Sequence, residues 1–287
     1  MPDVIPDVTL GCAIARGRHV EINGLRLHLL EGGRADGPVL CFLHGGSAHA
    51  HWFDAVLPHF ADRFHVISLD QRGHGESEWA SPPAYATEDF ASDLVALMDR
   101  MGWPRMAVVG HSMGGHNATA FAAWHPDRVS ALVIADSRPS LPPERLERMH
   151  DRGRRAPRLH ASRESALRSF RLLPRETVAS PVLLEHLAGH GLTNRDGGWT
   201  YRFDPACNGS RRPADLWPLL PRITAPTLIV RAELSPIMTP EIVSRMRAAL
   251  PHARHIEIPG AYHHLVLDTP GPFNAAVRTF LDEVLPG

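Results

Sequence analysis

Short apolar runs alternate along the chain with longer segments whose apolar positions recur at helical spacing. Each short run is almost continuously apolar, which is typical of strands buried on both faces of a sheet. Residues 19–33 alternate in character on both sides of Asn23-Gly24, a strong two-residue signal for a β-hairpin. The whole pattern predicts an α/β protein with a mostly parallel sheet and helices on both faces. The predicted central strands cover residues 39–44, 65–70, 105–110, 131–136, 226–231 and 254–259, and the predicted helices cover residues 86–102, 114–126, 240–251 and 272–285.

Residues 138–215 interrupt this alternation. They are rich in Arg, Pro and His, contain helical fragments, and show no convincing buried strand. Apolar residues such as Leu172, Leu184 and Trp199 argue against a disordered linker. An insertion of this length between two core strands is typical of a cap that covers one end of the sheet. We therefore expect a core of residues 1–137 and 216–287 that carries a helical cap, or lid, at residues 138–215.

Composition and charge exclude several classes of function. The 287 residues carry a formal net charge of -1, so no global basic field exists to attract nucleic acid or anionic lipid. The first twenty residues lack the apolar segment of a secretory signal, and no stretch approaches the roughly 18 apolar residues of a membrane span. The cysteines, Cys12, Cys41 and Cys207, are odd in number and far apart, which argues against a disulfide framework. We expect a cytoplasmic protein that binds neither nucleic acid nor membrane.

A serine between two glycines is the strongest chemical signal. Residues 110–114 read Gly-His-Ser-Met-Gly, directly after a predicted strand and directly before a predicted helix. A serine on a tight strand-to-helix turn needs small neighbours, because the strained backbone packs closely against nearby elements. Its hydroxyl then stands at the carboxyl end of the sheet, where the amides of the following helix favour developing negative charge. This context makes Ser112 a candidate nucleophile.

Four motifs in order resemble those of the α/β-hydrolase fold family, and the resemblance covers nearly the whole chain. The Ser112 turn looks like the family's nucleophile elbow. The other three are "FLHGGSAHAHWF" at residues 42–53, "LDQRGHGES" at residues 69–77 and "IPGAYHHLVLDTP" at residues 258–270. These look like the family's His-Gly segment, its Asp-x-x-Gly-x-Gly-x-Ser turn and its terminal histidine loop. The resemblance implies an α/β-hydrolase fold with a helical cap.

The resemblance also implies two catalytic side chains. Ser112 would be the nucleophile and His263 the general base that accepts its proton. The neighbouring His264 is the alternative base. The spacing from His263 through Asp268 to Pro270 fits the family pattern better. We therefore expect His263 to pair with Ser112.

Two backbone amides would form the oxyanion hole that the resemblance implies. One belongs to Met113, just after the nucleophile, and the other to Gly46, just after the His-Gly pair. Ser47 is a less favoured substitute for Gly46.

The acid of the triad does not stand where the family usually has it. In most members an aspartate follows the strand after the cap, but Ser235 or Pro236 occupies that position here. Two carboxylates remain as candidates: Asp136, at the end of the strand before the cap, and Glu233, in the loop after residues 226–231. We favour Asp136, because an acid at the end of a core strand is held rigidly. Glu233 is the alternative acid.

These residues predict a cofactor-free serine hydrolase that cleaves a carboxylic ester or lactone through an acyl-enzyme on Ser112. Two alternatives stay open: a carbon–carbon bond hydrolase of ring-cleavage products, and a ligand receptor that retains the triad. The expected partner is a small-molecule ester or lactone, and a homodimer is possible. Cap arginines could favour an anionic substrate, namely Arg138, Arg154, Arg155 and Arg158.

Nineteen histidines raise the question of a metal. His49 and His51 have a spacing that could chelate, but no supporting His, Asp or Glu cluster stands nearby in the sequence at zinc spacing. We therefore expect no catalytic metal and interpret these histidines as lining of the pocket. The glycines do not form a dinucleotide-binding pattern after the first strand.

Overall fold

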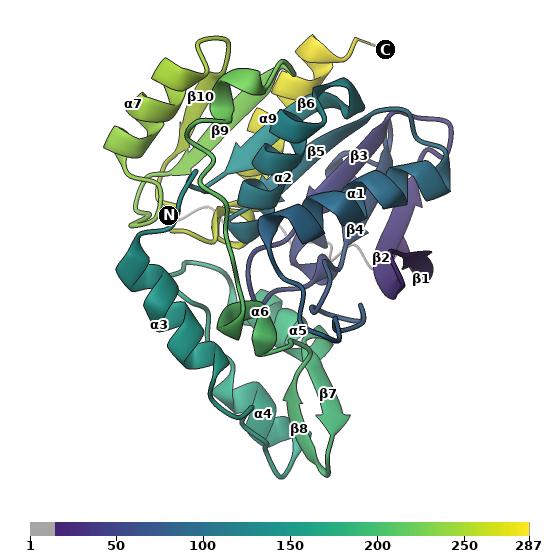
Figure 1. The fold of residues 1–287 in the computed structure, drawn as a ribbon, viewed down its shortest axis with the longest axis vertical. Coiled ribbons are helices and arrows are strands. Elements are labelled where there is room, and N and C mark those ends of the chain that lie inside the picture. The colour runs from purple at the N-terminus through teal and green to yellow at the C-terminus, as the bar shows by residue number, and fades with distance from the viewer. Residues whose placement is uncertain (1–14, 287) are drawn as a thin grey trace, which may run out of the picture.

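The computed structural model describes residues 15–286 as an open eight-stranded sheet with a smaller group of elements beneath one end of it (Figure 1). The strand order is β1-β2-β4-β3-β5-β6-β9-β10. The first two strands form an antiparallel hairpin whose turn residues Asn23 and Gly24 have φ of 51° and 75°. β2 pairs antiparallel with β4, and every other neighbouring pair is parallel. The strands are β1 (Ala15–Ile22), β2 (Leu25–Gly33), β3 (Val39–Leu43), β4 (His65–Leu69), β5 (Met106–His111), β6 (Val129–Ala135), β9 (Thr227–Ala232) and β10 (Arg254–Ile258).

The hairpin and the six central strands predicted from the apolar pattern are confirmed, each central strand within two residues. Successive side chains along these strands point to opposite faces of the sheet, so each strand contributes to two separate apolar cores. In β3, for example, Cys41 and Leu43 face one apolar cluster while Leu40 and Phe42 face the other.

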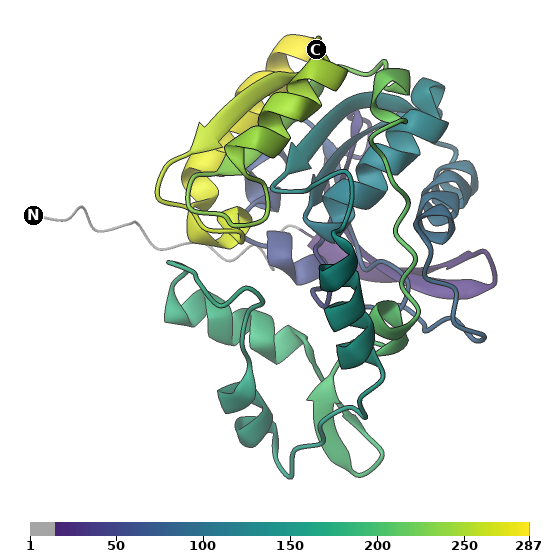
Figure 2. The same ribbon diagram turned by 60° about the vertical axis from the view of Figure 1, so that its left-hand side comes forward.

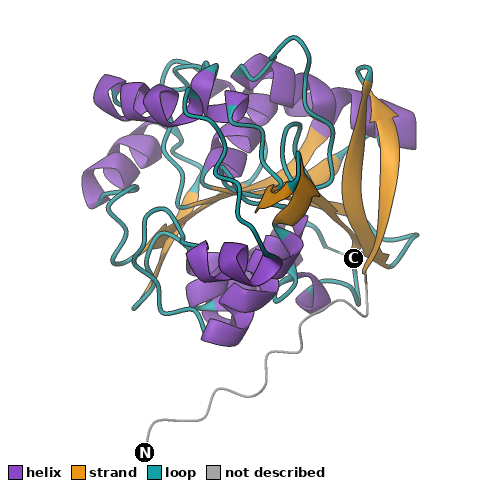
Figure 3. Ribbon diagram, turned by 90° about the horizontal axis from the view of Figure 1, so that it is seen from below, coloured by secondary structure: helices purple, strands orange, loops and turns teal. Residues whose placement is uncertain are grey.

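Helices cover both faces of the sheet, as the view from below shows (Figure 3). One core contains residues of α1 (Thr87–Met101), α2 (Met113–Trp124) and α7 (Pro240–Ala249). The other contains residues of α8 (Leu265–Asp268), α9 (Pro270–Val284) and the short 3-10 helix η1 (Ala50–Phe53). Burying an apolar face of each helix on the sheet fixes the loops at the carboxyl ends of the strands. No described helix is both long and apolar enough to cross a bilayer.

The insertion between β6 and β9 lies beneath the carboxyl ends of the parallel strands (Figures 1 and 2). It is mostly helical, but residues 192–201 form a short antiparallel hairpin that the sequence pattern did not predict. Asp196 and Gly197 make its turn with φ of 53° and 80°. An Asp-Gly pair favours such a turn, but four-residue strands are too short to give a clear apolar pattern. The elements are α3 (Pro143–Gly153), α4 (Arg163–Ser169), α5 (Pro181–His190), β7 (Leu192–Arg195), β8 (Gly198–Tyr201) and α6 (Ala206–Gly209).

Side-chain hydrogen bonds attach this insertion to the core. His49 Nε2 lies 3.0 Å from the carbonyl oxygen of Leu187 in α5, and His264 Nε2 lies 2.9 Å from that of Pro174. Two described cysteines, Cys41 and Cys207, are free and buried, whereas Cys12 lies outside the described residues.

Candidate active site

Ser112 occupies the sharp turn between β5 and α2. Its backbone has φ 53° and ψ -117°, a conformation that costs energy in any residue with a side chain. The flanking glycines make this turn sterically possible. A Cβ on Gly114 would lie 2.1 Å from the carbonyl oxygen of Leu43, and one on Gly110 would lie 2.4 Å from that of Gly114. The structure thus has the strand–turn–helix context expected from the sequence.

The structure brings His263 to Ser112. Its Nε2 lies 2.9 Å from the Ser112 hydroxyl oxygen. The loop after β10 supplies the histidine, and a neighbour in the elbow anchors that loop: His111 Nε2 lies 2.8 Å from the His263 carbonyl oxygen. His111 was not singled out from the sequence, because nothing in the pattern shows that it faces a loop 152 residues away.

Asp136 completes the hydrogen-bonded chain. Its Oδ2 lies 2.7 Å from His263 Nδ1, and its side chain is fully buried. It follows the last residue of β6 with φ 44°, a left-handed conformation that Asp tolerates better than most residues. Its carboxylate also accepts hydrogen bonds from the Ala232 amide, at 3.1 Å, and from the Ser235 hydroxyl.

Ser235, one of the two residues at the position where the family's aspartate was expected, donates to the carboxylate of Asp136. Glu233 points elsewhere: its carboxylate accepts a hydrogen bond from the Gly260 amide at 2.7 Å, and its side chain lies at the surface. His264, the alternative base, bonds to the cap rather than to Ser112. Of the candidate acids and bases, the structure brings Asp136 and His263 together with Ser112.

Burial dominates the electrostatics of this pair. Burial raises the pKa of the Asp136 carboxyl to about 6, and the hydrogen bonds from Ser235 and the Ala232 amide act in the opposite direction. Burial lowers the pKa of His263 well below its usual range, and the neighbouring His264 and Arg145 lower it further. A neutral His263 that donates its Nδ1 proton to an ionised Asp136 leaves Nε2 as an acceptor facing Ser112.

The two expected oxyanion donors border the same cavity as Ser112. Met113 is the first residue of α2, and Gly46 lies in the loop after β3. A Cβ on Gly46 would lie 3.9 Å from the Cβ of Met113, so the two backbones approach closely. Within the described chain, neither backbone N–H donates to a protein acceptor. Ser47 lines the same cavity with φ of 59°.

A cavity of about 200 Å³ lies between Ser112 and the inserted elements. Its core side includes Trp52 and Ile237. Arginines line much of the opposite side, and of the four cap arginines named from the sequence only Arg138 is among them. Arg154 pairs with Asp151 at the surface, and Arg155 and Arg158 are exposed. The lining arginines are Arg138, Arg145, Arg152, Arg171 and Arg211.

None of these five guanidinium groups forms an ion pair with a carboxylate among residues 15–286. Those of Arg138, Arg145 and Arg152 also donate no hydrogen bond to the described residues, and Arg138 Nε is buried without a partner. Burial lowers the pKa of Arg145, and the nearby Arg138 and Arg152 lower it further. Arg211 differs, because it donates to the Tyr85 carbonyl and to Asn117 Oδ1 and thus has a structural role.

The comparisons with known proteins agree with this architecture. A family model described as alpha/beta hydrolase fold matches residues 38–270. The chain therefore belongs to the α/β-hydrolase fold family. It is similar to 2-(acetamidomethylene)succinate hydrolase of Mesorhizobium japonicum, with 28% identity over 92% of this chain and 95% of the relative. It is also similar to 3-oxoadipate enol-lactonase 2 of Acinetobacter baylyi, with 25% identity over 87% of this chain and 90% of the relative.

A solved structure supports the same assignment. The crystal structure of E-2-(acetamidomethylene)succinate hydrolase superposes with a TM-score of 0.84 and 27% identity, and the match covers 93% of this chain and 99% of that one. The family match and the names of these relatives identify the chain as an α/β-fold hydrolase.

Proposed function

We propose that this hydrolase cleaves a carboxylic ester or lactone through an acyl-enzyme on Ser112. The observation that carries this proposal is the continuous chain of hydrogen bonds from Ser112 and His263, which line the cavity, to the buried Asp136. Such a chain activates a serine hydroxyl, which is a weak nucleophile on its own.

In the proposed reaction the Ser112 oxygen attacks the substrate carbonyl while His263 Nε2 accepts the hydroxyl proton. The amides of Gly46 and Met113 stabilise the oxyanion that develops on the carbonyl oxygen. His263 then donates its proton to the leaving alkoxide, which departs as the alcohol or opens the lactone ring. A water molecule that loses its proton to His263 hydrolyses the acyl-enzyme and regenerates Ser112.

We further propose that the substrate carries a carboxylate or another anionic group. The support is the set of unpaired guanidinium groups of Arg138, Arg145 and Arg152, which face the cavity that contains Ser112. Guanidinium groups bind carboxylates in a planar, two-bond geometry. Both relatives named above carry a dicarboxylate in their names, succinate and 3-oxoadipate, which agrees with an anionic substrate.

Intact mass after exposure to a fluorophosphonate tests the proposed nucleophile. We expect one adduct on the wild-type protein and on Ser92→Ala, an exposed serine of α1, and none on Ser112→Ala. No adduct on folded wild-type protein would contradict an activated Ser112.

Turnover assays then test the reaction class. A panel of esters, lactones and ring-cleavage diketones, each with and without a carboxylate, should give turnover of the anionic esters or lactones. Turnover of the diketones alone would favour carbon–carbon bond hydrolysis. Ligand binding without any turnover would favour a receptor.

A further inference from the structure

A second cluster of polar side chains lies where the cap meets the core, and it shares no residue with the catalytic cavity. It consists of His51 in η1, Asp54 just after η1, and His186 and His190 in α5. The two α5 histidines are four residues apart and therefore lie on one face of the helix. The candidate ligand atoms of the four side chains all lie within 4.8 Å of one another.

The carboxylate of Asp54 is the centre of this cluster. Its Oδ2 lies 2.9 Å from His51 Nδ1 and 2.7 Å from His186 Nε2. The carboxylate is almost fully buried. The rings of His51 and His190 stack with centroids 3.6 Å apart, so His190, the fourth side chain, packs directly against the cluster.

We propose that His51, Asp54, His186 and His190 together bind one divalent transition-metal ion, with Zn²⁺ as the best fit. Three imidazoles and one carboxylate form a four-ligand set of the kind that zinc binds tetrahedrally. Bonds of about 2.0–2.2 Å place tetrahedral ligand atoms about 3.3–3.6 Å apart. Because the candidate atoms lie within 4.8 Å of one another, binding requires the most separated pair to approach by at most about 1.5 Å.

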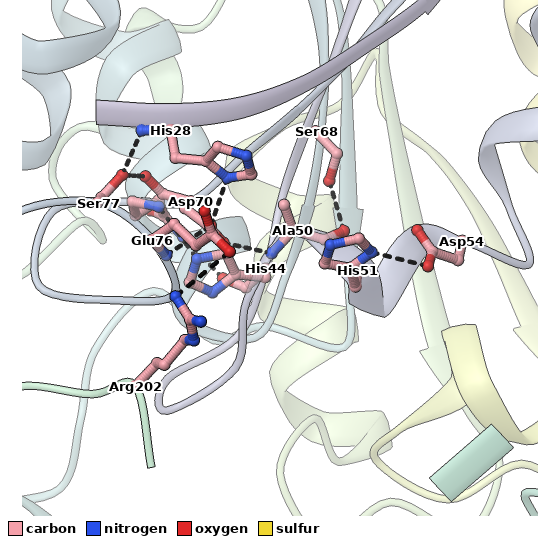
Figure 4. Close-up of polar contacts among 11 residues, drawn as sticks. His28, His44, Ala50, His51, Asp54, Ser68, Asp70, Glu76, Ser77 and Arg202 are labelled. Carbon is pink, nitrogen blue, oxygen red and sulfur yellow. Dashed lines mark hydrogen bonds and ion pairs between the residues drawn. The ribbon is translucent and has the colours of Figure 1, made fainter. Parts of the chain in front are cut away.

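The surrounding structure holds the ligands on the core side in place. The Ala50 amide donates to Asp70 Oδ1, and the Ala50 carbonyl accepts from the Ser68 hydroxyl at 2.7 Å, which fixes the start of η1 beside the sheet (Figure 4). The same figure shows the ring of His51 turned toward Asp54. A ligand carried by a fixed backbone loses little conformational entropy on metal binding.

The α5 ligands are also attached to this junction, because His49 Nε2 contacts the carbonyl oxygen of Leu187 between the two α5 histidines. A separate cavity of about 420 Å³, bordered by His51, Asp54 and His190, gives an ion access to the cluster. The four ligands come from two parts of the chain more than 130 residues apart. A bound ion would therefore clamp α5 of the cap to η1 of the core.

Metal binding by the intact, metal-stripped protein tests this proposal. We expect one equivalent of Zn²⁺ to bind, Co²⁺ to give the visible absorption of a four-coordinate site, and Zn²⁺ to raise the melting temperature. In His186→Ala/His190→Ala the Zn²⁺ affinity should fall at least 100-fold and the rise in melting temperature should disappear. The control, His59→Ala, removes an exposed histidine outside the cluster and should behave as wild type.

Two results would overturn the proposal: no stoichiometric binding at micromolar Zn²⁺, or equal affinity in the double variant and wild type. If the double variant does not fold, His190→Gln, which keeps most of the side-chain volume, replaces it with the same expected direction. Fluorophosphonate labelling of Ser112 reports separately on the proposed hydrolase function. Failure of metal binding with intact labelling would reject this site alone.

Discussion

The floor of the cavity and its cap side hold their polar groups in opposite ways. On the floor, Ser112 and His263, together with Asp136 buried behind them, each have a hydrogen-bond partner, and the ends of β5 and β6 position Ser112 and Asp136. On the cap side, the guanidinium groups of Arg138 and Arg145 are partly buried but lack a carboxylate partner within the described residues. Paired groups on a rigid sheet suit chemistry, whereas unpaired charges on a cap suit recognition of a ligand that supplies the missing partner.

The largest effect is expected on the floor. Asp136→Asn keeps the shape of the side chain and its tolerance of positive φ, but an amide cannot stabilise a charged His263. We expect kcat/KM to fall by about 10³–10⁴-fold. Glu233→Gln should change kcat/KM by less than about twofold, since the exposed Glu233 carboxylate accepts a bond from the Gly260 amide rather than from His263. A large loss in Glu233→Gln with little loss in Asp136→Asn would reverse the assignment of the acid.

An intermediate effect is expected on the cap side. In Arg145→Met the kcat/KM for a carboxylate-bearing ester should fall by about 10–100-fold, because a hydrogen bond to a charged group contributes about 1.5–3 kcal/mol. The kcat/KM for the matching neutral ester should change by less than about threefold. Arg154→Met is the matched control, since Arg154 pairs with Asp151 at the surface. Equal losses for both esters would show that Arg145 acts on the catalytic groups rather than on substrate charge.

The smallest effect concerns the acid limb of the pH–rate profile. The proposed mechanism requires an ionised Asp136, and burial raises the pKa of this carboxyl to about 6. Activity should therefore be present above pH 6 and be lost as the pH falls through about 6, while His263, whose pKa is lowered, stays neutral over this range.

Ser235→Ala sharpens this test. It removes a hydrogen bond that stabilises the Asp136 carboxylate, so the midpoint of the acid limb should rise by about one pH unit with little change in the plateau. Ser235→Thr should restore the wild-type midpoint. An unchanged midpoint in Ser235→Ala would show that Ser235 does not tune the acid.

Local patterns were enough to predict most of the core. Near-continuous apolar runs predicted the central strands, and Asn23-Gly24 predicted the hairpin turn. Both predictions are possible because burial and turn conformation depend on residues that are neighbours in the sequence. The glycines around Ser112 predicted the elbow for the same reason: Gly114 is needed where a Cβ would strike the Leu43 carbonyl. Each of these features is encoded in a short stretch of chain, so the sequence alone is enough to predict it.

The lining of the cap could not be predicted in the same way. Four cap arginines were named from the sequence, and only Arg138 borders the cavity. Arg145 and Arg152 also border it, seven residues apart and thus on one face of α3. Helical spacing shows which residues share a face, but it does not show which face turns toward the core.

The sequence by itself determined the fold, the elbow around Ser112 and the histidine loop, because each is encoded in a contiguous pattern. Only the tertiary structure decided between Asp136 and Glu233 as partner of His263, because that choice depends on β6 and β9 lying side by side. The same is true of the cluster at the cap junction, where α5 brings His186 to Asp54, 132 residues earlier in the chain. Contacts between distant segments arise from packing, and no local pattern records which of many side chains will meet.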